Sequence, residues 1–114
     1  MLKYFYSKDS IKRKILDIKD DIEKLVKTHC DEKLFIYWYG AYDIDPKYLV
    51  YWICIKTDKE KAKLKEDLKL NSELRQLLEK HKYPTDALKF VHIDFESQET
   101  VDRKSKGNWY QYFK

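Results

Sequence analysis

The first regular pattern along the chain is a stripe of apolar residues at helical spacing. The stripe follows intervals of four and three, through Ile11, Ile15, Ile18, Ile22 and Leu25. This spacing places all five side chains on one face of an α-helix. The side chain of Asp9 or Ser10 can accept hydrogen bonds from the free backbone N–H groups at the start of this helix. The pattern predicts an amphipathic helix that lies against a sheet and ends near residues 28–31.

Three later segments have the composition of β-strands. They are "KLFIYWYG" (33–40), "YLVYWICIKT" (48–57) and "LKFVHIDFES" (88–97), all rich in β-branched and aromatic residues. Between the first two, "AYDIDP" supplies the Asp and Pro that favour a turn, and Gly40 tolerates unusual backbone angles. We therefore expect the first two strands to form an antiparallel hairpin.

The segment from 58 to 84 is helical by composition. Leu64 and Leu68 form one short apolar stripe and Leu74, Leu77 and Leu78 form another, so we expect a break or kink at Asn71–Ser72 between them. Pro84 ends this helical region because it cannot donate a backbone hydrogen bond. After the third strand, a helical turn and then a short extended segment after Gly107 are expected. The aromatic rings of this tail should pack back on the body.

The order of these elements is α-β-β-α-β, which defines the fold class as α+β. We expect a mainly antiparallel sheet of three strands, with a four-stranded sheet as the alternative, packed against helices. A chain of 114 residues has the length of one domain, here residues 1–114.

Alternation along the strands divides the sheet into two chemically different faces. Ile36, Trp38, Tyr51, Ile53 and Phe95 belong to an aliphatic-rich set that should meet the helices. The opposite set is aromatic, hydroxylated and partly acidic: Phe35, Tyr37, Tyr39, Tyr48, Trp52, His92, Asp94 and Glu96. Three uses of this second face stay open: burial under the C-terminal aromatics, a protein-binding surface, or a ligand-binding cleft.

Composition and charge exclude several classes of protein. With 43% hydrophobic and 39% charged residues, the chain is too apolar for a disordered protein, and it has no long uncharged run. Its net charge of +4 arises from interspersed Lys, Arg, Asp and Glu residues rather than a basic stripe, which makes nucleic-acid binding unlikely. The N-terminus has no signal-peptide pattern, so we expect a cytoplasmic protein with Cys30 and Cys54 reduced.

No motif of known catalytic chemistry is present. The chain has only two glycines and no phosphate-binding loop, so we expect no cofactor. His92, Asp94 and Glu96 share one strand face, but the outer two lie about 13 Å apart along a strand, too far to bind one metal ion. No metal site is expected. Glu96, Glu99, Arg103 and Trp109 mark the place where a polar site would lie if there is one.

The segments "FESQETVD" and "GNWYQYF" near the C-terminus resemble the endings of small uncharacterised bacterial proteins, some with the size and α+β build of toxin-immunity proteins. The resemblance covers about twenty residues and contains no motif of known chemistry. It implies a small bacterial binding protein and assigns no functional residue.

These observations favour a bacterial, cytoplasmic, non-enzymatic module that binds another protein through its aromatic sheet face, with an immunity-type role as one form of this function. The first alternative is a small ligand-binding protein or hydrolase that uses His92, Asp94, Glu96 and Glu99. The second is RNA binding by stacking of bases on the aromatic face. No catalytic residue is assigned, and the oligomeric state stays open. The candidate binding residues are Tyr37, Tyr39, Tyr48, Trp52, His92, Asp94, Glu96, Glu99, Arg103 and Trp109.

Overall fold

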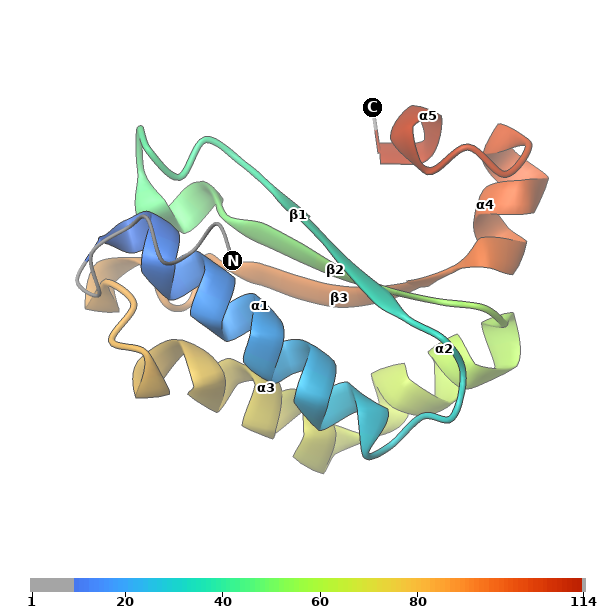
Figure 1. The fold of residues 1–114 in the computed structure, drawn as a ribbon, viewed down its shortest axis with the longest axis horizontal. Coiled ribbons are helices and arrows are strands. Elements are labelled where there is room, and N and C mark those ends of the chain that lie inside the picture. The colour runs from blue at the N-terminus through green and yellow to red at the C-terminus, as the bar shows by residue number, and fades with distance from the viewer. Residues whose placement is uncertain (1–9, 114) are drawn as a thin grey trace.

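A three-stranded sheet carries helices on one face and the C-terminal segment on the other (Figure 1). The computed structural model describes residues 10–113. Helices α1, α2 and α3 span Ile11–Lys27, Asp58–Glu66 and Leu68–Lys80, and strands β1, β2 and β3 span Phe35–Tyr39, Val50–Ile55 and His92–Ser97. Short 3₁₀ helices cover Pro46–Tyr48 and Thr85–Ala87, and the chain continues through α4 (Gln98–Ser105) and α5 (Trp109–Phe113). This arrangement confirms the predicted α+β class.

The core lies between the sheet and helices α1, α2 and α3. The predicted helical stripe is confirmed, because Ile15, Ile18 and Ile22 are completely buried. They meet the helix-facing side chains of the sheet, including Tyr51 and Phe95, which are also completely buried. The helix starts at Ser10, whose side chain accepts the N–H of Arg13; Asp9 lies outside the described residues.

One buried hydroxyl ties the helix to the central strand. The Tyr51 hydroxyl donates to the carbonyl of Ile15 at 2.6 Å. Burial raises the pKa of Tyr51 well above its usual value, so the phenol stays protonated and can donate this bond. A tyrosine in the core thus needs no contact with water.

The sheet is mixed, so the expectation of a mainly antiparallel sheet was wrong. Its strand order is β1-β2-β3; β1 pairs antiparallel with β2, as predicted, but β3 pairs parallel with β2. The reason is the connection through α2 and α3, because a helical crossover returns the chain to the end of the sheet where β2 began. Residues 10–113 contain no fourth strand.

The break between α2 and α3 also differs from the prediction. The break between the helices lies at Asp67, not at Asn71–Ser72: Asp67 has extended angles, and its side chain accepts the N–H of Leu70. Asn71 instead lies in the first turn of α3, where its amide donates to the carbonyls of Leu64 and Asp67. The pattern of leucines could not place the break, since a capping side chain decides where a helix begins.

The segment after Gly107 is helical rather than extended. Lys106 and Gly107 have positive φ angles of 50° and 81°, which end α4 and turn the chain back over the sheet. The five residues of α5 follow. Their rings pack against the sheet, as the sequence predicts, with the exception of Tyr110, which is 64% exposed.

Candidate functional site on the aromatic sheet face

The strand register confirms the predicted division of the sheet into two faces. On the face opposite α1–α3, Tyr37 pairs with Trp52, which pairs with Asp94. The neighbouring rows are Phe35–Cys54–Glu96 and Tyr39–Val50–His92. All three strands are therefore aligned without a bulge, and the aromatic and acidic residues share one surface.

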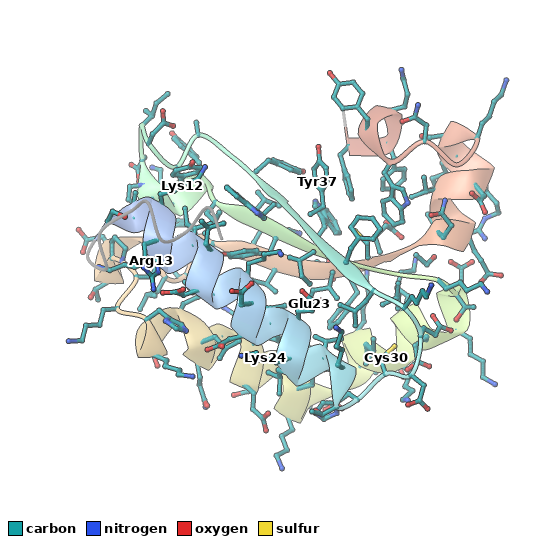
Figure 2. All side chains as sticks on the ribbon, viewed as in Figure 1. Lys12, Arg13, Glu23, Lys24, Cys30 and Tyr37 are labelled. Carbon is teal, nitrogen blue, oxygen red and sulfur yellow. The ribbon has the colours of Figure 1, made fainter. Side chains whose placement is uncertain are left out.

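Helix α5 covers the part of this face that lies towards the end of β3. Phe113 stacks on Tyr37 and on Trp52, with centroid distances of 5.0 and 5.2 Å. Trp109 meets the edge of Phe35 at 5.1 Å and donates to the side chain of Gln98 at 2.6 Å. Figure 2 shows Tyr37 on the side of the sheet that faces α5. The C-terminal aromatics thus cover Tyr37 and part of Trp52, which is the first of the three possible uses of this face.

The other part of the face stays uncovered by α5. Tyr48 and Phe90 are 48% and 53% exposed, and His92, also exposed, meets the edge of Trp52 at 5.1 Å. We call this surface the open aromatic patch, defined by Tyr48, Val50, Trp52, Phe90 and His92. Tyr39, 36% exposed, adjoins it and accepts a hydrogen bond from the indole N–H of Trp52.

Two lysines from different segments flank the open aromatic patch. The Lys47 ammonium lies 5.4 Å from the centroid of Tyr48 and 5.7 Å from that of Phe90. Lys89 lies 5.2 Å from the centroid of Phe90. Arg75, in α3, holds the loop that presents Lys89 and Phe90, because its guanidinium donates to the carbonyls of Leu88 and Val91. The patch therefore combines exposed rings with positive charge on a fixed loop.

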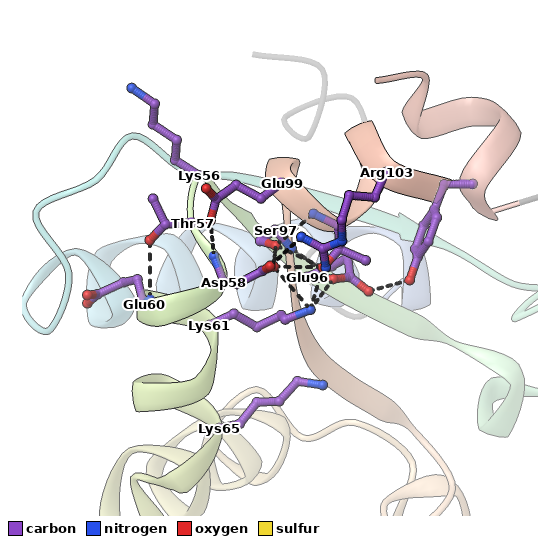
Figure 3. Close-up of polar contacts among 12 residues, drawn as sticks. Lys56, Thr57, Asp58, Glu60, Lys61, Lys65, Glu96, Ser97, Glu99 and Arg103 are labelled. Carbon is purple, nitrogen blue, oxygen red and sulfur yellow. Dashed lines mark hydrogen bonds and ion pairs between the residues drawn. The ribbon is translucent and has the colours of Figure 1, made fainter. Parts of the chain in front are cut away.

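A polar network lies at the opposite end of the parallel strand pair (Figure 3). Asp58, at the start of α2, accepts hydrogen bonds from Ser97 at 2.5 Å, from Thr100 at 2.7 Å and from Arg103 at 2.5 Å. Glu99 accepts the backbone N–H of Asp58 at 2.6 Å. The network joins the ends of β2 and β3 to the first turns of α2 and α4.

Glu96 forms the buried half of this network. Its side chain accepts from Lys61 at 2.8 Å and from the hydroxyl of Tyr112 at 2.5 Å, so it also ties α5 to β3. Burial raises the pKa of Glu96, but the hydrogen bonds from Lys61 and Tyr112 outweigh it, and the net pKa is lowered. Burial and the Glu96 carboxylate raise the pKa of Tyr112 to about 12. At neutral pH the Tyr112 hydroxyl is therefore protonated and donates its hydrogen bond to an ionised Glu96.

Hydrogen bonds satisfy the polar groups of the network within the protein itself. Those from Ser97, Arg103 and Thr100 hold the pKa of Asp58 well below its usual value. Among residues 10–113, every buried side-chain nitrogen and oxygen has a hydrogen-bond partner. The hydrogen bonds of Asp58 thus tie the start of α2 to β3 and α4.

The polar residues of the hydrolase alternative make different contacts in the structure. His92 and Asp94 approach within 3.9 Å of each other beside the open aromatic patch, and Asp94 also pairs with Lys65 at 3.7 Å. Glu96 and Glu99 lie in the polar network instead. Arg103 belongs to that network, and Trp109 belongs to the cover of the sheet. The ten candidate residues thus fall into three groups: the open part of the face, its cover, and the network.

The remaining candidate chemistry is also limited in the described part of the chain. Residues 10–113 contain no group of three or more His, Cys, Asp or Glu side chains that could hold a metal ion. Cys30 and Cys54 are buried free thiols, and burial raises the pKa of Cys54 to about 12. A thiol with that pKa carries almost no thiolate at neutral pH and is a poor nucleophile.

A hollow lies on the helical side of the molecule. It has a volume of about 670 Å³ and runs between α1 and α3, lined by charged side chains such as Asp21, Lys24 and Lys80 around Leu25 and Leu77. A smaller hollow of about 230 Å³ lies on the aromatic face, between Tyr37, Tyr39, Tyr110 and Phe113.

Sequence reasoning missed several residues of both surfaces. Phe90 alternates with His92 and so shares its face, which is a signal that could have added it to the site. Lys47 and Lys89 lie 42 positions apart, and nothing in the sequence shows that they meet around Phe90. Thr100 and Tyr112 join the network through contacts that only the folded chain creates.

Comparison with known proteins adds no identification. Searches against family models, curated proteins and solved structures gave no match to this chain. Within the described residues, none of the helices is both long enough and apolar enough to cross a membrane.

Proposed function

We propose that this chain is a non-enzymatic binding module that holds another protein on the open aromatic patch. The observation that carries the proposal is the exposure of Tyr48 and Phe90, just before β2 and β3, next to Trp52 and His92. Tyrosine and tryptophan are among the residues most enriched at interface hot spots. The side chains of the polar network, in contrast, bond to one another.

The partner that fits this patch presents carboxylates around an apolar centre. Lys47 and Lys89 supply the positive rim. The ammonium groups of both lysines lie over the ring of Phe90. The pair of Lys47 with Asp45 is long, at 3.9 Å. Both ammonium groups can thus turn to an acidic partner, which supports charge complementarity at the rim of an aromatic centre.

An immunity-type role is one form of this function: the partner is then a toxin whose surface carries the acidic residues. The resemblance of the C-terminal segments to small bacterial proteins supports this form. RNA binding by stacking is the competing use of the same rings and lysines, and the experiment must separate the two.

The test compares capture of partners from a nuclease-treated lysate of the source organism by the wild-type chain and by Y48A/F90A. Both rings are about half exposed, so the double variant should fold normally. L68A is the matched control, because Leu68 is 84% exposed on α3, in the helical layer. A partner held by the patch is retained by the wild type and by L68A and is lost from Y48A/F90A.

The captured protein is then purified and titrated against each variant by calorimetry. We expect Y48A/F90A to bind at least about 30-fold more weakly, since truncation of each hot-spot ring costs about 1 kcal/mol or more. Equal affinity of Y48A/F90A and the wild type would refute the proposal. The same capture is run in untreated lysate, and a partner retained only there would refute the proposal and favour the RNA alternative.

A further inference from the structure

Strand β1 is an outer strand whose free edge is not used within the described chain. The register from Phe35↔Cys54 to Tyr39↔Val50 accounts for its pairing with β2 on one side. Outside that ladder, no backbone hydrogen bond among residues 10–113 involves a residue of β1. The N–H and C=O groups on the other side of β1 are therefore available to another strand.

The two edges of the sheet differ in how they are protected. The other outer strand, β3, carries His92, Asp94 and Glu96, and charged side chains discourage pairing between edges. In contrast, β1 reads Phe-Ile-Tyr-Trp-Tyr, with no charge, proline or glycine and no bulge in its register. An unprotected, regular edge of five residues is a template for strand addition.

We propose that two copies of this chain pair through antiparallel contact of their β1 strands and form one continuous sheet across a two-fold axis. This inference goes beyond the proposed function, because β1 is not part of the open aromatic patch. In an antiparallel pair, the side chains of two directly opposite residues lie on the same face of the sheet. When β1 pairs with its own copy, odd-numbered residues can therefore lie opposite only odd-numbered residues, and even-numbered ones opposite even-numbered ones. The register that pairs all five residues is centred on Tyr37.

In this register the two copies are chemically complementary. Phe35 lies opposite Tyr39 of the second copy, Tyr37 opposite Tyr37, and Ile36 opposite Trp38, so aromatic residues meet aromatic residues on one face. Cross-strand pairs of this kind each contribute about 0.2–1 kcal/mol. A two-fold interface requires a self-complementary surface, which this strand provides.

Surroundings of the strand add two further contacts. Phe35 is 44% exposed, and its position opposite Tyr39 brings its ring beside the hollow of about 230 Å³ that Tyr39 and Tyr110 line in the other copy. The exposed Lys33 precedes β1, and the turn with Asp43 follows it. Antiparallel pairing places each lysine near the acidic turn of the second copy, which favours this orientation over a parallel one.

The test of the register is disulfide trapping in the full-length chain. In Y37C the two introduced thiols lie directly opposite each other, within the distance of about 6 Å between Cα atoms that a disulfide allows. Y39C is the matched control. In this register its two introduced thiols are offset by four residues along the strands, about 13 Å, which is too far for a disulfide. We expect air oxidation to convert Y37C, but not Y39C, into a covalent dimer. The buried Cys30 and Cys54 do not compete.

A second measurement does not depend on new thiols. Sedimentation of the wild-type chain over a concentration series should show a dimer, and F35K/Y39K should be monomeric because like charges face each other twice. F35E/Y39K should restore the dimer, since opposite charges then face each other in the same register. Circular dichroism shows whether each variant is folded.

Three outcomes would overturn the proposal. They are a wild-type chain that stays monomeric at the highest concentration, equal trapping of Y37C and Y39C, and equal dimerisation of F35K/Y39K and the wild type. None of them bears on the open aromatic patch, so failure of the dimer and failure of the proposed function are distinguishable.

Discussion

Phe113 is the side chain that should decide whether α5 stays on the sheet. Helix α5 has only five residues, too few to be stable alone, so its position depends on side-chain contacts. Phe113 stacks on Tyr37 and Trp52 and also meets Trp109 within the helix, at 5.7 Å. We therefore choose F113A as the perturbation.

The size of the effect follows from the partial burial of this ring. A fully buried Phe→Ala substitution costs about 3–5 kcal/mol, and Phe113 is only partly buried, so we expect about half of that, ~2 kcal/mol. The two stacked pairs alone account for about 1–3 kcal/mol. Because α5 can leave the sheet without unfolding the core, the loss should appear as local opening. A change of ~2 kcal/mol raises the opening equilibrium about 30-fold.

Native-state hydrogen exchange measures this opening directly. In F113A, amides of 109–113 should exchange about 30-fold faster, while amides of β2 keep their wild-type protection. Y110A is the control, because Tyr110 lies in the same helix but is 64% exposed. Unchanged protection of α5 in F113A, or an equal loss throughout the chain, would refute the view that Phe113 fastens a separately opening helix.

Two further predictions concern backbone geometry and acid stability. Gly40 has a φ of +117°, and a Cβ there would lie 2.0 Å from the carbonyl oxygen of Tyr48, so G40A should lower the unfolding free energy by more than about 2 kcal/mol. In G107A the Cβ would meet side chains rather than backbone, at 2.9 Å from Asp102 and 3.9 Å from Gln98, and chemical denaturation should show a smaller loss. Because the pKa of Asp58 is lowered, the stability that its carboxylate contributes is present above pH 3.8 and is lost as the pH falls below that value. The unfolding free energy of D58N should therefore depend less on pH in this range than that of the wild type. Parallel acid titrations of D58N and the wild type would contradict this prediction.

The parts of the fold that follow from local periodicity could be predicted from the sequence. Helix α1 and the division of the sheet into two faces depend on spacings of 3.6 and 2 residues, which the chain displays openly. Alternation accordingly predicts Tyr37 and Trp52 on the same face, and the register pairs them. The direction of β3 could not be obtained in this way, since it depends on how α2 and α3 lead the chain back, although two consecutive helices between strands already favour a parallel pair.

The candidate site shows the same limit more clearly. Alternation placed Tyr48 and His92 on the aromatic face, but their exposure depends on how far α5 reaches. That reach is set by contacts of Tyr112 and Phe113 with residues far away in the sequence. Lys89 approaches Phe90 and Lys47 only because Arg75 holds the intervening loop. Contacts of this kind have no local signature.

The central position of β2 has a consequence for the order in which the chain assembles. Its pairing with β1 closes a loop as short as that between Tyr39 and Val50, whereas every pairing with β3 joins residues 42 positions apart, such as Val50 and His92. Closing the longer loop costs about 1 kcal/mol more conformational entropy. The β1–β2 hairpin should therefore form first, with both of its edges still open. During synthesis, the side of β2 reserved for β3 stays unpaired until the last quarter of the protein is available to cover it.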